Sequence, residues 1–286
     1  MTKMEKLKKR LREYRNSPGS FIIFLLLVLS AIITAGVTFS IIIYVAVKGI
    51  PYLDQDMFSL KYTEENQSML PSIINTIYMT ALSLLFAVPI GIGCAIYLVE
   101  YAKRGNKFVT VIRLTAETLS GIPSIVYGLV GYLIFVIGLK LGLTLLGGSL
   151  TMATMILPLI MRTTEEALIA VPDMYREGSY GLGAGRLRTI FSIILPSAVP
   201  GILSGVILGV GRVVGETAAL IFTAGSVAKA ATSLMSSSRT LSVHMYIQQS
   251  EGLHMNEAFA TAVVLLIVVV IINLASELIA GKLTKK

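Results

Sequence analysis

Long apolar runs recur along this sequence and limit its possible folds more than any other feature. A helix that crosses the hydrocarbon core of a bilayer, roughly 30 Å thick, needs about 20 predominantly apolar residues. Such runs occupy residues 21–47, 72–99, 119–139, 145–161, 190–222 and 258–279, of which 145–161 is short and 190–222 is interrupted by charge. We therefore predict an all-α membrane protein with six transmembrane helices.

The composition agrees with a chain surrounded largely by lipid. Hydrophobic residues make up 55% of the 286 residues and charged residues only 14%, whereas soluble domains carry about 25% charged residues. A net charge of +8 would suggest nucleic acid as the partner of a soluble protein. Here we predict a lipid bilayer and no nucleic acid. Cys94 is the single cysteine, so no disulfide can form within the chain.

The first eighteen residues are strongly basic, and a basic stretch before an apolar run can open a signal peptide. The run that follows, residues 21–47, contains no charge and exceeds the 7–15-residue core of such peptides. We expect a retained first transmembrane helix.

The distribution of basic residues predicts the orientation. Six spans place both termini on one side, together with the loops 100–113 and 162–189. That side holds seven Lys and Arg in the N-terminal tail, four in each loop and three in the C-terminal tail, against five on the other side. Because cytoplasmic segments carry the excess of Lys and Arg, we expect a multi-pass protein of the cell membrane with both termini in the cytoplasm.

The loop at residues 162–189 is the most informative connection. It predicts a short helix over 163–170 and, after Pro172, a second helix over 174–182 that Gly183 and Gly185 end. A short helix across the cytoplasmic face would suit contact with a soluble partner. On shape alone, an ordinary connecting loop is the alternative.

A spaced motif in this loop favours the partner-binding interpretation. The motif consists of Glu177, Gly178, Ser179, Gly183, Ile193, Ile194, Leu195 and Pro196. It resembles the EAA…G…I-LP motif of importer permeases in the ATP-binding-cassette (ABC) class, with Gly178 and Ser179 where the family has alanines. The resemblance implies that this helix, about 173–183, couples the permease to an ATPase subunit.

Three further segments resemble the phosphate-permease branch of that family: 121–128, 157–166 and 212–225. The similarity covers roughly residues 70–280. It implies an N-terminal part at 1–70 with the basic tail, first helix and outer loop, a type-1 importer transmembrane domain at 71–280 with five core helices, and a short tail at 281–286.

The resemblance also implies partners and a division of labour. We expect a heterodimer with a homologous second permease, two copies of a cytoplasmic ATPase and an extracytoplasmic phosphate-binding protein. The sequence contains no GxxxxGK[ST] phosphate-binding loop, so another polypeptide must hydrolyse ATP. We therefore expect no enzyme activity and no cofactor in this chain, with ATP and Mg bound by the partner ATPase.

Charged residues inside the apolar runs are candidates for the substrate pathway, because an intramembrane charge is expensive and normally faces protein or water. Arg212 and Glu216 lie four apart, which predicts one helix face and an ion pair. The planar guanidinium of Arg212 suits a phosphate, although a pair that only fixes packing is the alternative. We assign Arg212, Glu216, Thr217 and Arg162 to the pathway. Arg162 could also pair with Glu166 or reach the membrane interface.

Other residues receive no chemical role. Gly201, Gly205 and Gly209 repeat at intervals of four, which predicts a close packing face whose neighbour could be the partner subunit. His244, His254 and Cys94 are interpreted as surface or packing residues. We predict no catalytic group and no metal site.

Three alternatives stay open. The first is an importer permease for another oxyanion, such as molybdate, sulfate or phosphonate, because the coupling motif does not distinguish substrates. The second is an ion-coupled secondary transporter, which would need no ATPase. The third is a membrane-embedded enzyme, for which the sequence shows no cluster of acids, histidines or metal ligands.

Overall fold

A computed structural model describes residues 18–103 and 105–283, and these residues form helices and loops with no β-strand. The helices are α2 (Pro18–Gly49), α3 (Leu70–Ile96), α4 (Lys107–Ser120), α5 (Ser124–Gly131), α6 (Leu145–Ile169), α7 (Asp173–Gly181), α8 (Arg186–Thr189), α9 (Leu195–Gly215), α10 (Ala218–Thr223), α11 (Leu241–Glu251) and α12 (Met255–Leu283). The basic tail 1–17, Arg104 and residues 284–286, which contribute to the predicted topology, lie outside the described residues.

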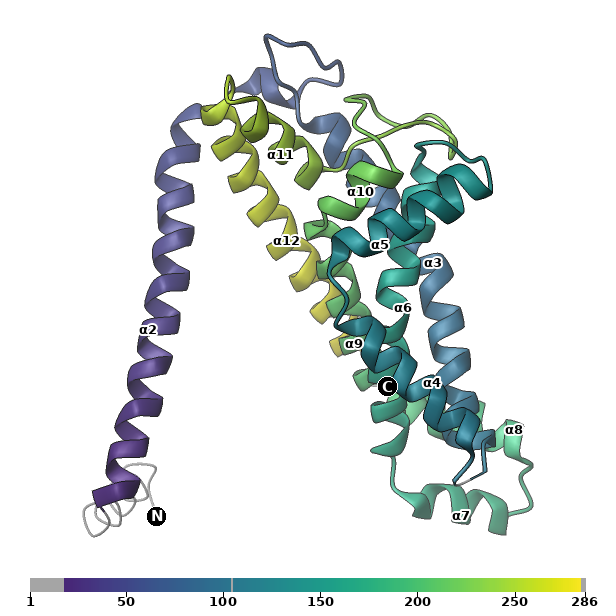
Figure 1. The fold of residues 1–286 in the computed structure, drawn as a ribbon. Helices are drawn as coiled ribbons and strands as arrows, with labels where there is room; N and C mark the ends of the chain where they lie inside the picture. The colour runs from purple at the N-terminus through teal and green to yellow at the C-terminus, as the bar shows by residue number, and fades with distance from the viewer. Residues whose placement is uncertain (1–17, 104, 284–286) are drawn as a thin grey trace.

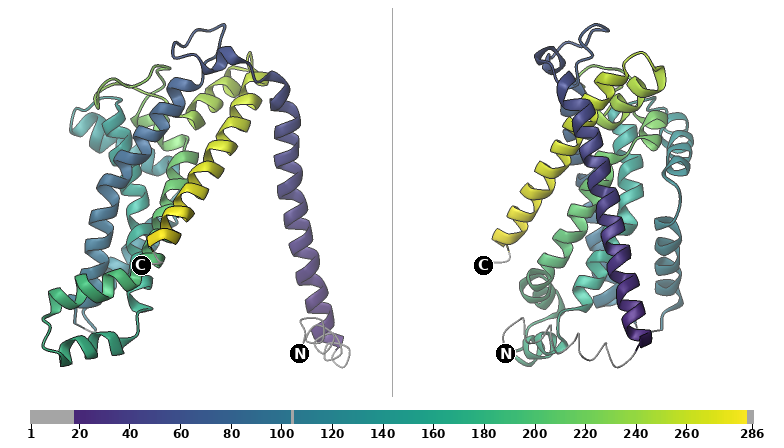
Figure 2. Two further views of the ribbon diagram at one scale, coloured as in Figure 1. Left: turned by 180° about the vertical axis from the view of Figure 1, so that it is seen from behind. Right: turned by 90° about the vertical axis from the view of Figure 1, so that its left-hand side faces the viewer.

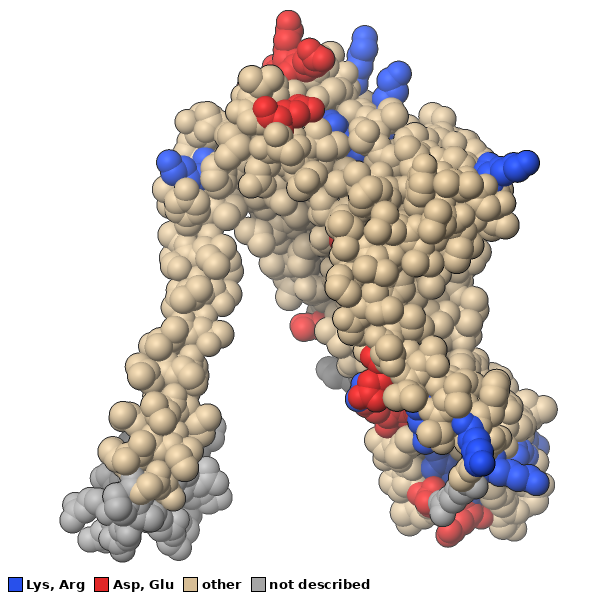
Figure 3. Space-filling model, in the orientation of Figure 1, with Lys and Arg blue, Asp and Glu red and all other residues tan. Residues whose placement is uncertain are grey.

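The molecule is elongated, and we name its two ends after the helices found there (Figure 1). The α7 end carries α7, α8 and the start of α4, whereas the α11 end carries α11 and the loop after α2. Charged side chains gather at both ends and are sparse over the middle of the face seen in Figure 3. An uncharged middle is what a bilayer requires of the helices that cross it.

Five helices are long and apolar enough to cross a membrane, and α4 with α5 form a sixth crossing if the bent pair is one span. The crossings are Gly19–Tyr52, Leu70–Tyr101, Leu145–Ile169, Arg186–Gly215 and Met255–Leu278, with Lys107–Ser120 and Ser124–Gly138 as the bent pair. The prediction of an all-α membrane protein with six transmembrane helices is confirmed. The boundaries of the third, fourth and fifth crossings differ from those predicted.

The third crossing is the bent pair, and the prediction of a single span over 119–139 is wrong. Helices α4 and α5 meet at 107°. The bend follows from Pro123, which has no N–H to continue α4 and disfavours helical backbone in the residue before it. The loop predicted at 100–113 is also too long. Asn106 caps α4, its side chain accepting a hydrogen bond from the Phe108 amide at 2.9 Å, so the helix begins at Lys107.

The fourth crossing continues through the segment predicted as a separate helix over 163–170. Helix α6 is unbroken to Ile169. Two of its polar residues at this point face the protein: Thr164 is fully buried, and Glu165 pairs with Arg113 of α4 at 2.5 Å. A charged stretch therefore extends the helix beyond the apolar run instead of ending it.

The fifth crossing ends earlier than predicted, at Gly215, and the short helix α10 follows after two non-helical residues. The polar connection predicted over 223–257 contains α11, which the sequence pattern did not reveal.

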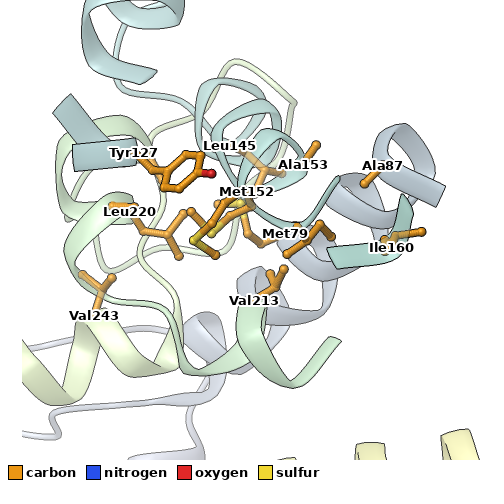
Figure 4. Packing of buried hydrophobic residues seen from close by; sticks show 14 residues of the cluster. Met79, Ala87, Tyr127, Leu145, Met152, Ala153, Ile160, Val213, Leu220 and Val243 are labelled. Atoms are coloured by element: carbon orange, nitrogen blue, oxygen red, sulfur yellow. The ribbon is translucent and has the colours of Figure 1, made fainter. Parts of the chain in front are cut away.

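The main core lies where α3, α6, α9 and α10 meet (Figure 4). Met79, Met152, Val213 and Leu220 converge there, and each is at most 1% exposed. Methionine suits this junction of irregular helices, because its unbranched side chain fills uneven gaps.

Helix α2 stands apart from this bundle (Figure 2). It contacts α12 and the turn that follows α2, near the α11 end. Tyr44 packs edge-on against Phe259 with ring centroids 5.9 Å apart. Close approach requires glycine at position 49, since a Cβ there would lie 2.7 Å from the carbonyl carbon of Phe259. The remaining apolar surface of α2 is exposed, as a helix in contact with lipid requires.

Candidate functional site

Helix α7 lies across the far end of the bundle, between the ends of α6 and α9 (Figure 1). Pro172 is its N-cap, and the helix ends at Gly181, close to the predicted range of 173–183. Gly183 follows with φ +83°, a left-handed conformation that favours glycine. The chain turns back there toward α8.

The motif residues of α7 divide between two faces. Glu177 and Gly178 are exposed, and a Cβ added at Gly178 would meet no atom within 4 Å. Ser179 is 5% exposed, and its hydroxyl lies 2.8 Å from that of Thr189 in α8. Glu177 and Gly178 are thus free to meet another protein, whereas Ser179 fixes α7 to α8.

The distal part of the motif enters the bundle. Ile193 and Leu195 are half-buried against an apolar cluster that includes Leu98 and Leu168, and Pro196 occupies the first turn of α9. A rigid path therefore runs from α7 through α8 into α9.

Arg176, to which the sequence analysis gave no role, fastens α7 to two crossings at once. Its Nε and Nη2 atoms donate to Oε1 of Glu100 at 3.1 and 2.8 Å, at the end of the α3 crossing. The guanidinium also donates to the carbonyls of Val171 and Leu168 at 2.8 and 2.9 Å, and to Asp173 at 3.1 Å. Glu100 ends an apolar run 76 residues earlier, so no local pattern links it to Arg176.

A cavity of about 580 Å³ lies beside this fastening. Its charged lining residues are Lys103, Arg113, Arg176, Arg186, Glu100 and Asp173. Basic groups outnumber carboxylates there, and the guanidinium of Arg186 lies 5.3 Å from the ring centre of Tyr101. The α7 end thus presents positive charge around an otherwise well-paired helix.

Among the predicted pathway residues, Arg212 lies in the last turn of α9 and is half-buried. It lies within electrostatic range of Tyr127 in α5, whose hydroxyl donates to the Leu119 carbonyl at 2.9 Å. Among the ion pairs of the described residues, none includes Arg212. Arg212 thus offers an unpaired cation near the bend between α4 and α5.

The predicted ion pair between Arg212 and Glu216 is wrong. Helix α9 ends at Gly215, and Glu216 has extended backbone, so the spacing of four does not place the two side chains on one helix face. Glu216 lies one residue before Thr217, the N-cap of α10, and its Oε1 accepts from the Ala219 amide in the first turn of α10 at 3.2 Å. Thr217 lies in the same break, and its carbonyl accepts from the amides of Leu220 and Ile221.

Arg162 lies away from Arg212, on α6 near the α7 end. Its Nε is 3.2 Å from Oε1 of Glu166, and both side chains are more than half exposed. Arg212, Glu216 and Thr217 therefore lie at the end of α9 and in the break before α10. Arg162 lies elsewhere, in a surface pair with Glu166.

The glycine stripe of α9 faces α6 of the same chain. A Cβ added at Gly201 would lie 2.6 Å from Cβ of Ala167, one at Gly205 would collide with Thr163, and one at Gly209 would touch Ile156 and Ile160 at 3.7–3.8 Å. These contacts link the helix that carries Arg212 to the helix that leads into α7.

A second close helix–helix contact joins the short helices α5 and α10 near Arg212. At Gly128 of α5, an added Cβ would lie 2.7 Å from Cα of Ala219 in α10. Helices α5 and α10 therefore pack tightly together, one after the bend that follows α4 and the other after the break that follows α9.

Comparison with known proteins agrees with this architecture. Residues 87–286 match the family described as "Binding-protein-dependent transport system inner membrane component". The probable ABC transporter permease protein YqgI of Bacillus subtilis is 32% identical over 276 residues, 90% of this chain and 94% of that protein. The phosphate transport system permease protein PstA 1 of Mycobacterium tuberculosis is 33% identical over 218 residues, 75% of this chain and 71% of that protein.

Two solved structures share the fold. A chain of a bacterial alginate ABC transporter superposes with a TM-score of 0.69 at 17% identity, over 96% of this chain and 99% of that one. A chain of the MetNI methionine ABC transporter superposes with a TM-score of 0.64 at 20% identity, over 81% and 100% respectively. At these identities the likeness concerns the fold. Taken with the family match, it shows that the chain belongs to the binding-protein-dependent inner membrane component family, as a multi-pass, PstA-like permease with the type-1 ABC importer fold.

Proposed function

We propose that this chain moves inorganic phosphate into the cell as one of two homologous permease subunits. The observation that carries the choice of an anion is Arg212, a half-buried guanidinium without a carboxylate partner among the described ion pairs. An unpaired charge at such depth is unfavourable unless water or a ligand meets it. A planar guanidinium binds phosphate oxygens with paired donors, and relatives at about 33% identity carry the name of phosphate permeases.

The coupling to ATP is assigned to α7. Exposed Glu177 and Gly178 dock on a cytoplasmic ATPase, two copies of which serve the two permeases and bind ATP and Mg. This orientation puts the α7 end and both termini in the cytoplasm. An extracytoplasmic phosphate-binding protein delivers the ion to the α11 end. The chain itself holds no cofactor, and its domain from about residue 71 onward carries the transport function.

The contacts of α7 support a mechanical route. Movement of α7 reaches the α3 crossing through Arg176 and Glu100, and it reaches α9 through Ser179 and Thr189. Helix α9 carries Arg212 at its opposite end. Tilting α9 would therefore move Arg212 relative to α5 and α10, so that the ion is exposed first on one side and then on the other.

The test is uptake of radioactive phosphate by the complete transporter in proteoliposomes, with the ATPase supplied inside. Arg212→Gln should lower uptake at least about tenfold, because a charge-assisted hydrogen bond contributes about 1.5–3 kcal/mol. Arg188→Gln, which removes an exposed arginine of α8, is the matched control and should leave uptake within about twofold. Normal uptake by the Arg212 variant in an assembled complex would contradict the pathway assignment.

Competition separates the remaining substrates. An excess of unlabelled phosphate should abolish labelled uptake, whereas sulfate, molybdate and phosphonate should have little effect. Stronger competition by one of these would make the chain a permease for that oxyanion. Uptake that needs an ion gradient and no ATPase would instead make it a secondary transporter.

A further inference from the structure

Five residues with buried polar groups lie at the α11 end, and the proposed pathway does not use them. Each of them is at most 4% exposed, and each has a side-chain nitrogen or oxygen atom that meets no hydrogen-bond partner. The cluster, which we call the Arg239 cluster, consists of Ser72, Ser238, Arg239, Thr240 and His244.

Two residues of α3 hold the cluster together. The Asn75 side chain donates to the carbonyl of Arg239 at 3.2 Å, and the Thr76 hydroxyl accepts from the Leu241 amide at 2.9 Å. The segment 238–241 is thereby fixed against the first turns of α3. Ser72 lies on the same face of α3, one turn before Thr76, and so belongs to this neighbourhood.

Arg239 is the charged centre of the cluster. The guanidinium is buried, its Nε and Nη2 atoms have no acceptor, and none of the described ion pairs includes it. Its one close aromatic contact is the ring of Tyr62, whose centre lies 4.6 Å from the Arg239 Cζ atom. The cation–π contact and the nearby Tyr62 hydroxyl offset part of the charge, whereas Nε and Nη2 have no acceptor at hydrogen-bond geometry.

His244 shares the same aromatic ring. Its imidazole packs edge-on to Tyr62 with centroids 6.1 Å apart, so Arg239 and His244 both contact one side chain. Neither ring nitrogen of His244 has a partner at hydrogen-bond geometry, although the Gln67 backbone lies close enough to act on the imidazole. Nearly all buried polar groups in proteins are hydrogen-bonded, so this group of side chains is suited to hold a bound species such as water or an ion.

The chemistry of the free groups specifies that species. A guanidinium, three hydroxyls and an imidazole offer mainly donors, and the charged member is positive. Among the described ion pairs no carboxylate lies within 4.0 Å of Arg239, and the charge of Glu251 acts on it only from farther away. Water alone would leave most of the positive charge without compensation. A tetrahedral oxyanion has several acceptor oxygens and a negative charge, and arginine binds such groups with two parallel hydrogen bonds.

We propose that the Arg239 cluster binds one small tetrahedral oxyanion at the α11 end, apart from Arg212. Residues 59–68 cover the site, because Tyr62 of this loop lies against both Arg239 and His244. The Gln248 side chain of α11 donates to Gln67 Oε1 of the cover at 3.3 Å, and within the cover the Tyr62 hydroxyl donates to the same oxygen at 3.3 Å. This loop is the element that would open to admit the ion.

The test measures binding of radioactive inorganic phosphate to the full-length chain in nanodiscs, without a binding protein or ATP. The parent carries Arg212→Gln, so that one site is measured. Saturable binding of one phosphate per chain is expected. Arg239→Gln should weaken it at least about tenfold, because a charge-assisted hydrogen bond is lost. Lys48→Gln removes an exposed charge from the end of α2, outside the cluster and its cover, and should leave the affinity within about twofold.

A second variant keeps the test informative if Arg239→Gln does not fold. Ser72→Ala removes an unpartnered hydroxyl without changing the charge, and it should weaken phosphate binding between about twofold and tenfold while the melting temperature without phosphate is unchanged. Absence of saturable binding in the parent, or binding that both variants retain, would overturn the proposal. Equal competition by chloride would overturn the assignment to an oxyanion.

Transport in the same variants separates this proposal from the proposed function. Without the Arg212 change, a chain that binds phosphate at the Arg239 cluster but imports none would refute import and keep the cluster. Import in the absence of a binding site at the cluster would do the reverse.

Discussion

Each end of the molecule holds a largely enclosed arginine, and the two arginines differ in their hydrogen-bond acceptors. At the α7 end, Arg176 has two carboxylates and two carbonyls as acceptors, and its side chain is 14% exposed. At the α11 end, Arg239 is 4% exposed and stacks on Tyr62, yet its Nε and Nη2 atoms meet no acceptor.

This difference suggests different roles: Arg176 links two helices, whereas Arg239 is suited to bind a ligand. A guanidinium whose N–H donors all have acceptors within the chain can transmit displacement between α7 and α3. A guanidinium whose N–H donors lack acceptors can hydrogen-bond to a ligand. Burial of arginine alone therefore says little about its role, and the identity of its acceptors decides it.

The largest effect is expected from removing Arg176, whose hydrogen-bond acceptors all lie within the chain. Arg176→Ala leaves Glu100 buried without compensation, which should destabilise the chain by about 3–5 kcal/mol. ATPase activity in the assembled transporter should also lose its dependence on substrate. Chemical unfolding in detergent and an ATPase assay measure the two effects. Arg188→Ala, at an exposed arginine of α8, is the control.

Replacing both partners sharpens that test. Arg176→Met combined with Glu100→Met removes the charge pair together and should recover most of the stability, because no buried charge is left alone. Coupling should stay impaired, since the hydrogen bonds to the carbonyls of Leu168 and Val171 are absent. Full activity in the double variant would show that the link is not required.

An intermediate effect is expected at the α11 end as the pH falls. Burial, and after it the charge of Arg239, lowers the pKa of His244 to about 3, against a smaller opposing effect of the Gln67 backbone. The unfolded chain binds this proton near pH 6.5, so stability is fully present above that pH and declines below it. Between pH 7 and pH 5 the loss should be on the order of 2 kcal/mol.

His244→Gln removes the titrating group and should flatten this decline. Unfolding by denaturant at pH 7, 6 and 5 measures it, with His254→Gln as the control for removing a histidine from the same end. A decline that is equally steep in the His244 variant would show that another group causes it. The Arg239 cluster would then not hold a neutral histidine.

The smallest effect is expected at Glu216, which lies between the two ends and accepts a hydrogen bond from a backbone amide instead of pairing with an arginine. Glu216→Ala removes the side-chain hydrogen bond to the first turn of α10 and should destabilise by about 1 kcal/mol, whereas Glu216→Gln keeps an acceptor and should change little. In a double-mutant cycle with Arg212→Gln, the coupling energy should stay below about 0.5 kcal/mol. A clearly larger coupling would restore the ion pair that the spacing predicted.

Much of the candidate site could be predicted because its signals are local. The range of α7 follows from Pro172 and Gly183, and the outward positions of Glu177 and Gly178 agree with a partner-binding role. Arg176 was missed because its main partner, Glu100, is distant in sequence. Glu216 was misassigned because a spacing of four has meaning only within a continuous helix.

The sequence by itself determined the membrane character, the six crossings and the family motif, since these depend on composition and on spacing within single segments. Tertiary structure decided the bend at Pro123, the extension of α6 to Ile169 and the acceptors of every buried arginine. Those features depend on which side chains meet across helices. The free energy of a buried charge is set by its neighbours in space, and the order of residues does not name them.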